Sequence, residues 1–152
     1  MKRRILLVDD DLAVLLTLKA VLELNGFEVD TAGSSAEALV RMESGVYQMV
    51  ISDLRMETEE AGLEVIRAAR RQAYDPATAL LTAYPPSGNH WQTEHRNGQE
   101  DWTENSDSLL VKPLGTGDLL RQVEALLIRH ADKQESQRNS ASKAQQTGRR
   151  AG

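Results

Sequence analysis

Hydrophobic residues along this chain gather in four short runs, and each run is closed by polar side chains. The runs are 5–8, 49–51, 79–81 and 109–111, and the residues that close them are Asp9 and Asp10, Asp53, Thr82 and Lys112. Short apolar runs with polar residues beside them indicate buried β-strands. In an open parallel sheet, ligands bind in the crevice at the carboxyl ends of the strands. We therefore expect these polar side chains to meet at one edge of a sheet.

The segments between these runs carry apolar residues at helical spacing. Gly26 is a natural stop for the first helix, and Ser34 with Glu37 forms a capping box before the second. The predicted helices cover 12–25, 35–44, 62–72 and 116 to about 130. Alternation over 27–32 predicts an edge strand. Five strands that alternate with helices predict an α/β fold of parallel βαβ units with right-handed crossovers.

Two regions do not fit this alternation. Between 84 and 108, where a fourth helix is expected, the large apolar residues after Tyr84 are Trp91 and Trp102. Whether this atypical region is a helix or a disordered loop stays open. Residues 132–152 contain no large apolar side chain and are rich in Gln, Ser, Lys and Arg, which predicts a disordered tail after a domain of residues 1–131.

Composition narrows the class of protein. A chain of 152 residues is long enough for one domain, and the lack of cysteine excludes disulfides, thiol nucleophiles and Cys-ligated metal sites. No apolar stretch approaches the roughly 20 residues needed to span a bilayer, so we expect a soluble, cytoplasmic protein without membrane contact. Residues 1–131 carry 13 Lys and Arg against 21 Asp and Glu. So acidic a body argues against nucleic-acid binding by this part of the chain.

The polar residues at the strand ends suggest a particular chemistry. Neighbouring carboxylates raise one another's pKa unless a cation joins them, and oxygen ligands without His or Cys favour Mg²⁺. Such a site has the parts needed to transfer a phosphoryl group onto a carboxylate. Asp53 would be the nucleophile, and Asp9 and Asp10 would hold Mg²⁺. Lys112 and Thr82 would bind the phosphoryl oxygens. Each residue alone has an ordinary alternative as a helix cap or loop charge, and Asp11 is expected to be a cap.

The joint pattern resembles the receiver domain of two-component response regulators over about residues 3 to 130. The motifs that carry the resemblance are Val8-Asp9-Asp10-Asp11, Ile51-Ser52-Asp53-Leu54-Arg55-Met56, Leu81-Thr82-Ala83 and Val111-Lys112-Pro113. The resemblance implies a flavodoxin-like (βα)5 fold with strand order 2-1-3-4-5. It also implies Mg²⁺-dependent transfer of a phosphoryl group from the phosphohistidine of a histidine kinase, or from a phosphotransfer protein, to Asp53. The resemblance also implies that Asp9, Asp10, Asp53 and the main-chain carbonyl of Arg55 would hold the metal. The side chains of Arg55 and Tyr84 would flank the phosphoryl group.

The chain also departs from the family pattern. Met56-Glu57 replaces the usual Met-Pro, and Gly62 stands nine positions after Asp53 instead of eight. Leu109 occupies the position of the family's switch aromatic, and the segment from Thr82 to Lys112 is longer than usual. Signalling by rotation of an aromatic ring is therefore not expected in its usual form.

These observations favour a stand-alone receiver without an output domain, which signals through protein contacts. Residues 84–108 would order against an unknown downstream partner, or their two tryptophans would simply cover the edge of the sheet. Such a protein catalyses its own phosphorylation and dephosphorylation, so calling it an enzyme is a matter of convention. Two alternatives stand beside this interpretation. One is a phosphatase similar to haloacid dehalogenases, which would leave Asp53 without a role. The other is a binding module on a receiver fold that works without phosphorylation.

Overall fold

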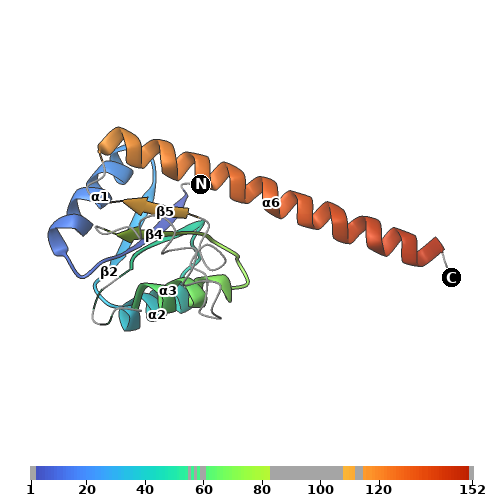
Figure 1. Ribbon diagram of the computed structural model, residues 1–152, viewed down its shortest axis with the longest axis horizontal. Helices are drawn as coiled ribbons and strands as arrows, with labels where there is room; N and C mark the ends of the chain where they lie inside the picture. Colours follow the sequence, from blue (N-terminus) through green and yellow to red (C-terminus); the bar gives the residue numbers. More distant parts are fainter. Residues whose placement is uncertain are drawn as a thin grey trace, which may run out of the picture.

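The computed structural model describes residues 3–54, 56, 58, 61–82, 108–111 and 115–150. A parallel sheet lies between two layers of helices, and one long helix projects from the body (Figure 1). The strands are β1 (Arg4–Val8), β2 (Glu28–Ala32), β3 (Met49–Asp53), β4 (Ala77–Thr82) and β5 (Ser108–Val111). The helices are α1 (Leu12–Leu24), α2 (Ser35–Ser44), α3 (Ala61–Arg70) and α6 (Thr116–Arg150).

The strands lie in the order β2-β1-β3-β4-β5, and every neighbouring pair is parallel. The predicted order 2-1-3-4 is thus confirmed, and β5 pairs with β4 from Ala79↔Ser108 to Thr82↔Val111. The predicted and observed strand ends differ by one or two residues, as is usual at fraying ends. The fourth helix expected in 84–108, with Trp91 and Trp102, lies outside the described residues.

Both faces of the inner strands are buried, which explains why β1, β3 and β4 are apolar runs without polar alternation, whereas the edge strand β2 is partly exposed. On one face, side chains of β1, β3 and β4 pack with α1 and α6, and on the other, side chains of β1 and β3 pack with α2 and α3. Successive residues of β1 separate accordingly, because Ile5 and Leu7 belong to the first cluster and Leu6 and Val8 to the second. This two-sided core holds the strand ends in fixed positions.

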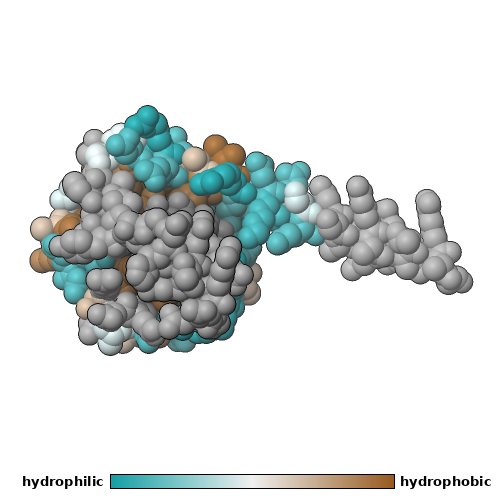
Figure 2. Space-filling view, in the orientation of Figure 1, coloured by the Kyte–Doolittle hydropathy of each residue, from teal (hydrophilic) through white to brown (hydrophobic). Residues whose placement is uncertain are grey.

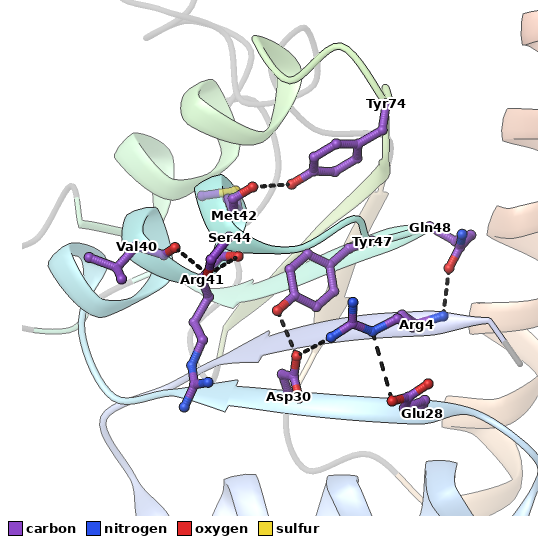
Figure 3. A network of polar contacts seen from close by, with 10 residues as sticks. All are labelled: Arg4, Glu28, Asp30, Val40, Arg41, Met42, Ser44, Tyr47, Gln48 and Tyr74. Atoms are coloured by element: carbon purple, nitrogen blue, oxygen red, sulfur yellow. Dashed lines mark hydrogen bonds and ion pairs between the residues drawn. The ribbon is translucent and has the colours of Figure 1, made fainter.

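A network of polar contacts joins three strands near the amino end of β1 (Figure 3). An Arg4 Nη2 donates a hydrogen bond to Asp30 Oδ2 at 2.7 Å, and the Tyr47 hydroxyl donates to the same oxygen at 2.7 Å. The guanidinium carbon of Arg4 lies 5.0 Å from the centre of the Tyr47 ring. Because Arg4 is on β1, Asp30 is on β2 and Tyr47 precedes β3, these contacts fasten the edge strand β2 to β1 and to the segment before β3.

The last helix corrects one sequence prediction. A helix that ended near His130 and a disordered tail over 132–152 were expected, but α6 continues to Arg150. Residues 132–150 contain no proline, one glycine and many good helix formers such as Ala, Gln, Lys and Arg. Because α6 already begins against the core, this segment extends an existing helix and avoids the costly nucleation step. The division into a domain of 1–131 and a separate tail remains a prediction.

Among the described residues, no helix combines the length and the hydropathy required to cross a bilayer.

Candidate functional site

Two acidic residues come together because β1 and β3 are neighbours. Val8 pairs with Ser52, so Asp9 and Asp53, each one residue further on, lie side by side at the carboxyl edge of the sheet. Their exposed fractions are only 2 % and 9 %, whereas Asp10 is exposed. One carboxylate oxygen from each of Asp9, Asp10 and Asp53 lies within 4.8 Å of the others. The predicted acidic cluster is therefore formed by the fold.

The neighbouring Asp11 has a different role, as expected. Its side chain accepts hydrogen bonds from the backbone N–H groups of Ala13 and Val14 at 3.0 and 3.4 Å, which caps α1. Its own N–H donates to Asp9 Oδ1 at 2.9 Å. The turn that starts α1 therefore also holds the Asp9 carboxylate in place.

Thr82 reaches the same edge through β4. It is the last residue of that strand and is 3 % exposed. The residue before it, Leu81, pairs with Asp53, and the Leu81 carbonyl accepts a hydrogen bond from the Leu54 N–H at 2.8 Å. Thr82 thus follows directly after the residue that pairs with Asp53.

The other predicted site residues are only partly placed. Leu109 lies on β5, where its backbone pairs with Leu80. Arg55, Tyr84 and Lys112 lie outside the described residues, so their expected roles stay predictions.

Gly62 contributes to the site in a way that its sequence position did not reveal. A Cβ atom at this position would lie 2.2 Å from the main-chain oxygen of Asp53 and 2.6 Å from Leu54 Cα, which is closer than any real contact. The Gly62 N–H also donates to the Leu54 carbonyl at 3.0 Å. The first turn of α3 therefore packs directly on the backbone of Asp53, and only glycine allows this approach.

The donor set of the acidic cluster fits a hard divalent cation. Three carboxylates this close repel one another, and a cation between them relieves the repulsion. All three groups offer oxygen, which suits Mg²⁺, and the exposed Asp10 leaves one side open to the water and phosphate oxygens that Mg²⁺ prefers to keep. The arrangement is an acidic site of the kind that binds Mg²⁺.

Comparisons with known proteins agree with this geometry. The chain is 33% identical over 130 residues to the transcriptional regulatory protein PrrA of Mycobacterium tuberculosis, a match that covers 83% of this chain and 50% of PrrA. It is 41% identical over 81 residues to the alginate biosynthesis transcriptional regulatory protein AlgB of Pseudomonas syringae, which covers 53% of this chain and 18% of AlgB. The chain therefore spans half or less of the length of these relatives.

Solved structures share the fold over most of the chain. A CheY-like receiver domain protein from Methanospirillum hungatei has a TM-score of 0.71 at 26% identity and covers 88% of this chain and 99% of its own. The response regulator TrrA from Thermotoga maritima, solved in complex with Mg²⁺ and BeF, has a TM-score of 0.64 at 35% identity and covers 82% and 98%. An adenylate cyclase from Rhodopirellula baltica has a TM-score of 0.69 at 31% identity and covers 94% and 99%.

Residues 5–124, which are most of the chain, match the family described as the response regulator receiver domain. This match, the sheet order and the acidic cluster at the end of β1 and β3 support one conclusion. The chain belongs to the response regulator receiver domain family.

Proposed function

We propose that this receiver domain accepts a phosphoryl group on Asp53 from the phosphohistidine of a histidine kinase or a phosphotransfer protein. The observation that carries this proposal is the grouping of Asp9, Asp10 and Asp53, whose carboxylate oxygens lie within 4.8 Å of one another. Asp53 is the central candidate because it ends a buried strand and lies between β1 and β4. The Mg²⁺ and BeF bound by the Thermotoga maritima protein support the same chemistry for its relatives.

In the proposed reaction, a carboxylate oxygen of Asp53 forms a bond to phosphorus as the phosphorus–nitrogen bond of the donor breaks. The donor imidazole keeps the electron pair of that bond and takes up a proton. A bound Mg²⁺ supplies positive charge that offsets the charge of the transferring group. Asp9, Asp10 and Asp53 would hold the metal, with the Arg55 carbonyl as a further oxygen ligand.

Two other residues are proposed to bind the transferring phosphoryl group. The Thr82 hydroxyl donates a hydrogen bond to one phosphoryl oxygen, and the Lys112 ammonium pairs with another. The position of Thr82, one residue beyond the partner of Asp53 in β4, supports its part. The side chains of Arg55 and Tyr84 flank the acyl phosphate and influence its lifetime.

The output is proposed to be contact with a downstream protein in the cytoplasm, with residues 84–108 as part of the contact surface. Phosphorylation adds about −1.5 to −2 charges at the carboxyl edge of the sheet, which is enough to shift a two-state equilibrium nearby. With Leu109 at the switch position, this shift does not use an aromatic ring at that position.

Incubation with acetyl phosphate and Mg²⁺, followed by intact mass spectrometry, tests the proposal. The wild-type chain is expected to gain the mass of one phosphoryl group, and Asp53→Asn is expected to gain none. Asp30→Asn is a matched control, because Asp30 lies on β2 outside the acidic cluster, and it should still be phosphorylated. No gain in the wild type would instead favour a binding module that works without phosphorylation.

A further inference from the structure

Polar side chains of α6 contact the body at a point away from the acidic cluster. Two side chains of α6, one turn apart, reach the turn between α3 and β4. His130 Nε2 lies 2.8 Å from the main-chain oxygen of Asp75, and Gln134 Nε2 donates to that oxygen at 3.1 Å and to Asp75 Oδ2 at 2.9 Å. A single residue of the body thus receives both side chains of the helix.

The receiving residue is held in an unusual conformation. Asp75 has φ 46°, in the left-handed region that residues other than glycine seldom adopt. Its N–H donates to the Gln72 carbonyl at 3.0 Å, and the hydroxyl of the preceding Tyr74 donates to the Met42 carbonyl of α2 at 3.0 Å. Such a conformation persists only when the surroundings enforce it. The turn is therefore a fixed point on the body and can orient whatever binds it.

The part of α6 that follows these contacts depends on them for its stability. Residues 132–150 have no large apolar side chain, so they cannot be held by hydrophobic packing. Figure 2 shows the part of α6 that leaves the body as hydrophilic where it is coloured. In proteins, most of the stability of a helix comes from the packing of an apolar face, and this segment has no such face. Whether the segment stays helical and in which direction it leaves the body thus depend on its last contacts with the body.

We infer that Asp75 is a clamp that keeps α6 helical beyond the core and fixes the direction in which it leaves the receiver. His130 and Gln134 are the two residues of α6 that the clamp holds. This inference does not depend on phosphorylation of Asp53. It assigns a conformational function to a turn that no part of the phosphoacceptor chemistry uses.

The position of the clamp also relates it to the acidic cluster. Asp75 lies between α3 and β4, and the opposite ends of these two elements are at the cluster. α3 begins at Ala61 with Gly62 against the Asp53 backbone, and β4 ends at Thr82. A shift of either element relative to α6 would therefore change the contacts that His130 and Gln134 make with Asp75.

Hydrogen–deuterium exchange measured by mass spectrometry on the full chain tests the clamp. In Gln134→Ala and in Asp75→Ala, the amide hydrogens of about residues 131–138 should exchange about fivefold faster than in wild type. Each variant loses the hydrogen bond between the Gln134 side chain and the Asp75 carboxylate. Gln137→Ala is the matched control, because it makes the same change at an exposed position one turn further on. Its exchange should equal or fall below that of wild type, since alanine is the better helix former.

Two further variants separate the clamp from a general loss of stability. In Asp75→Asn, the asparagine can adopt the left-handed conformation and still offers an oxygen acceptor. The amides of residues 131–138 should therefore exchange as slowly as in wild type. In the double variant Asp75→Ala/Gln134→Ala, exchange should rise by less than the combined effect of the two single variants, because both of them remove the hydrogen bond between Gln134 Nε2 and Asp75 Oδ2. Amides of β1 and β3 serve as the internal reference and should not change. Equal or slower exchange in Gln134→Ala than in wild type would overturn the inference.

Discussion

Asp9, Asp10 and Asp11 are three identical side chains in a row, and each has a different environment. Asp9 is buried and bonded to the Asp11 N–H, Asp10 is exposed beside Asp53, and Asp11 caps α1. The chemistry of each carboxylate is therefore set by its position at the end of β1, because residue type alone does not distinguish them.

Replacing Asp10 should weaken Mg²⁺ binding. Asp10→Asn keeps an oxygen but removes one negative charge from the cluster, and cation affinity follows the charge of the ligands. We expect the dissociation constant for Mg²⁺, measured by isothermal titration calorimetry, to rise about tenfold or more.

Asp11→Asn is the matched control for this measurement. Asparagine caps helices as well as aspartate does, so α1 should be unaffected and Mg²⁺ affinity should stay near that of wild type. If both substitutions weakened Mg²⁺ binding equally, Asp10 would not be a specific ligand of the metal.

At the scale of elements, the contact of α3 with β3 depends on one glycine. Gly62→Ala would place a methyl group 2.2 Å from the Asp53 carbonyl oxygen, so the helix or the strand end must move. We expect the free energy of unfolding, measured by urea denaturation, to fall by about 1–3 kcal/mol. The proposed phosphorylation of Asp53 by acetyl phosphate should also slow, because the displaced backbone carries this candidate acceptor.

Gly117→Ala in α6 offers the comparison, because no heavy atom lies within 4 Å of a Cβ at that position. It should leave the free energy of unfolding unchanged or raise it slightly, as alanine favours helices. A Gly62 variant as stable and as readily phosphorylated as the Gly117 variant would contradict the close packing.

The helices and strands that bury apolar side chains could be predicted from the hydrophobic pattern of the sequence. Strands with buried faces on both sides appear as apolar runs, and the order of β2, β1, β3 and β4 followed from the family resemblance. The extension of α6 was missed because a projecting helix has no apolar face and resembles a disordered polar segment. The packing of Gly62 was missed because the approach of two backbones leaves no periodic signal, although a glycine at the start of a helix was a visible hint.

At the scale of the whole molecule, the sequence also predicted where the acidic residues meet. Asp9 and Asp53 come together because parallel strands place their carboxyl ends at one edge. The clamp could not be predicted in this way. Asp75 and His130 are 55 residues apart, and their contact depends on the angle at which α6 crosses the body.

Stability at high pH is a property of the whole fold that depends on Tyr47. Burial, followed by the hydrogen bond to Asp30 and the charge of Asp30, raises the pKa of Tyr47 well above its ordinary value, and burial also raises the pKa of Tyr74. Above about pH 10, tyrosines of the unfolded chain lose protons that these two keep in the folded state. The unfolded state then binds fewer protons, so the free energy of unfolding must fall as pH rises.

Tyr47→Phe removes one of these two groups. Urea denaturation between pH 9 and about 11 should show a shallower decline of the unfolding free energy than in wild type, by up to about 1.4 kcal/mol per pH unit. At neutral pH the variant should be less stable by about 1 kcal/mol, because the hydrogen bond to Asp30 is lost. Parallel curves for the two proteins would contradict the raised pKa.

The direction of α6 has a practical consequence. The helix starts after β5 at the carboxyl edge of the sheet, passes Asp75 at the start of β4, and leaves the body from the opposite edge (Figure 1). The proposed phosphodonor would therefore approach Asp53 at one pole of the molecule, while the far end of α6 extends from the other. A fluorophore or surface tether attached near Arg150 would leave the acidic cluster open, so phosphorylation could be followed on an immobilised protein.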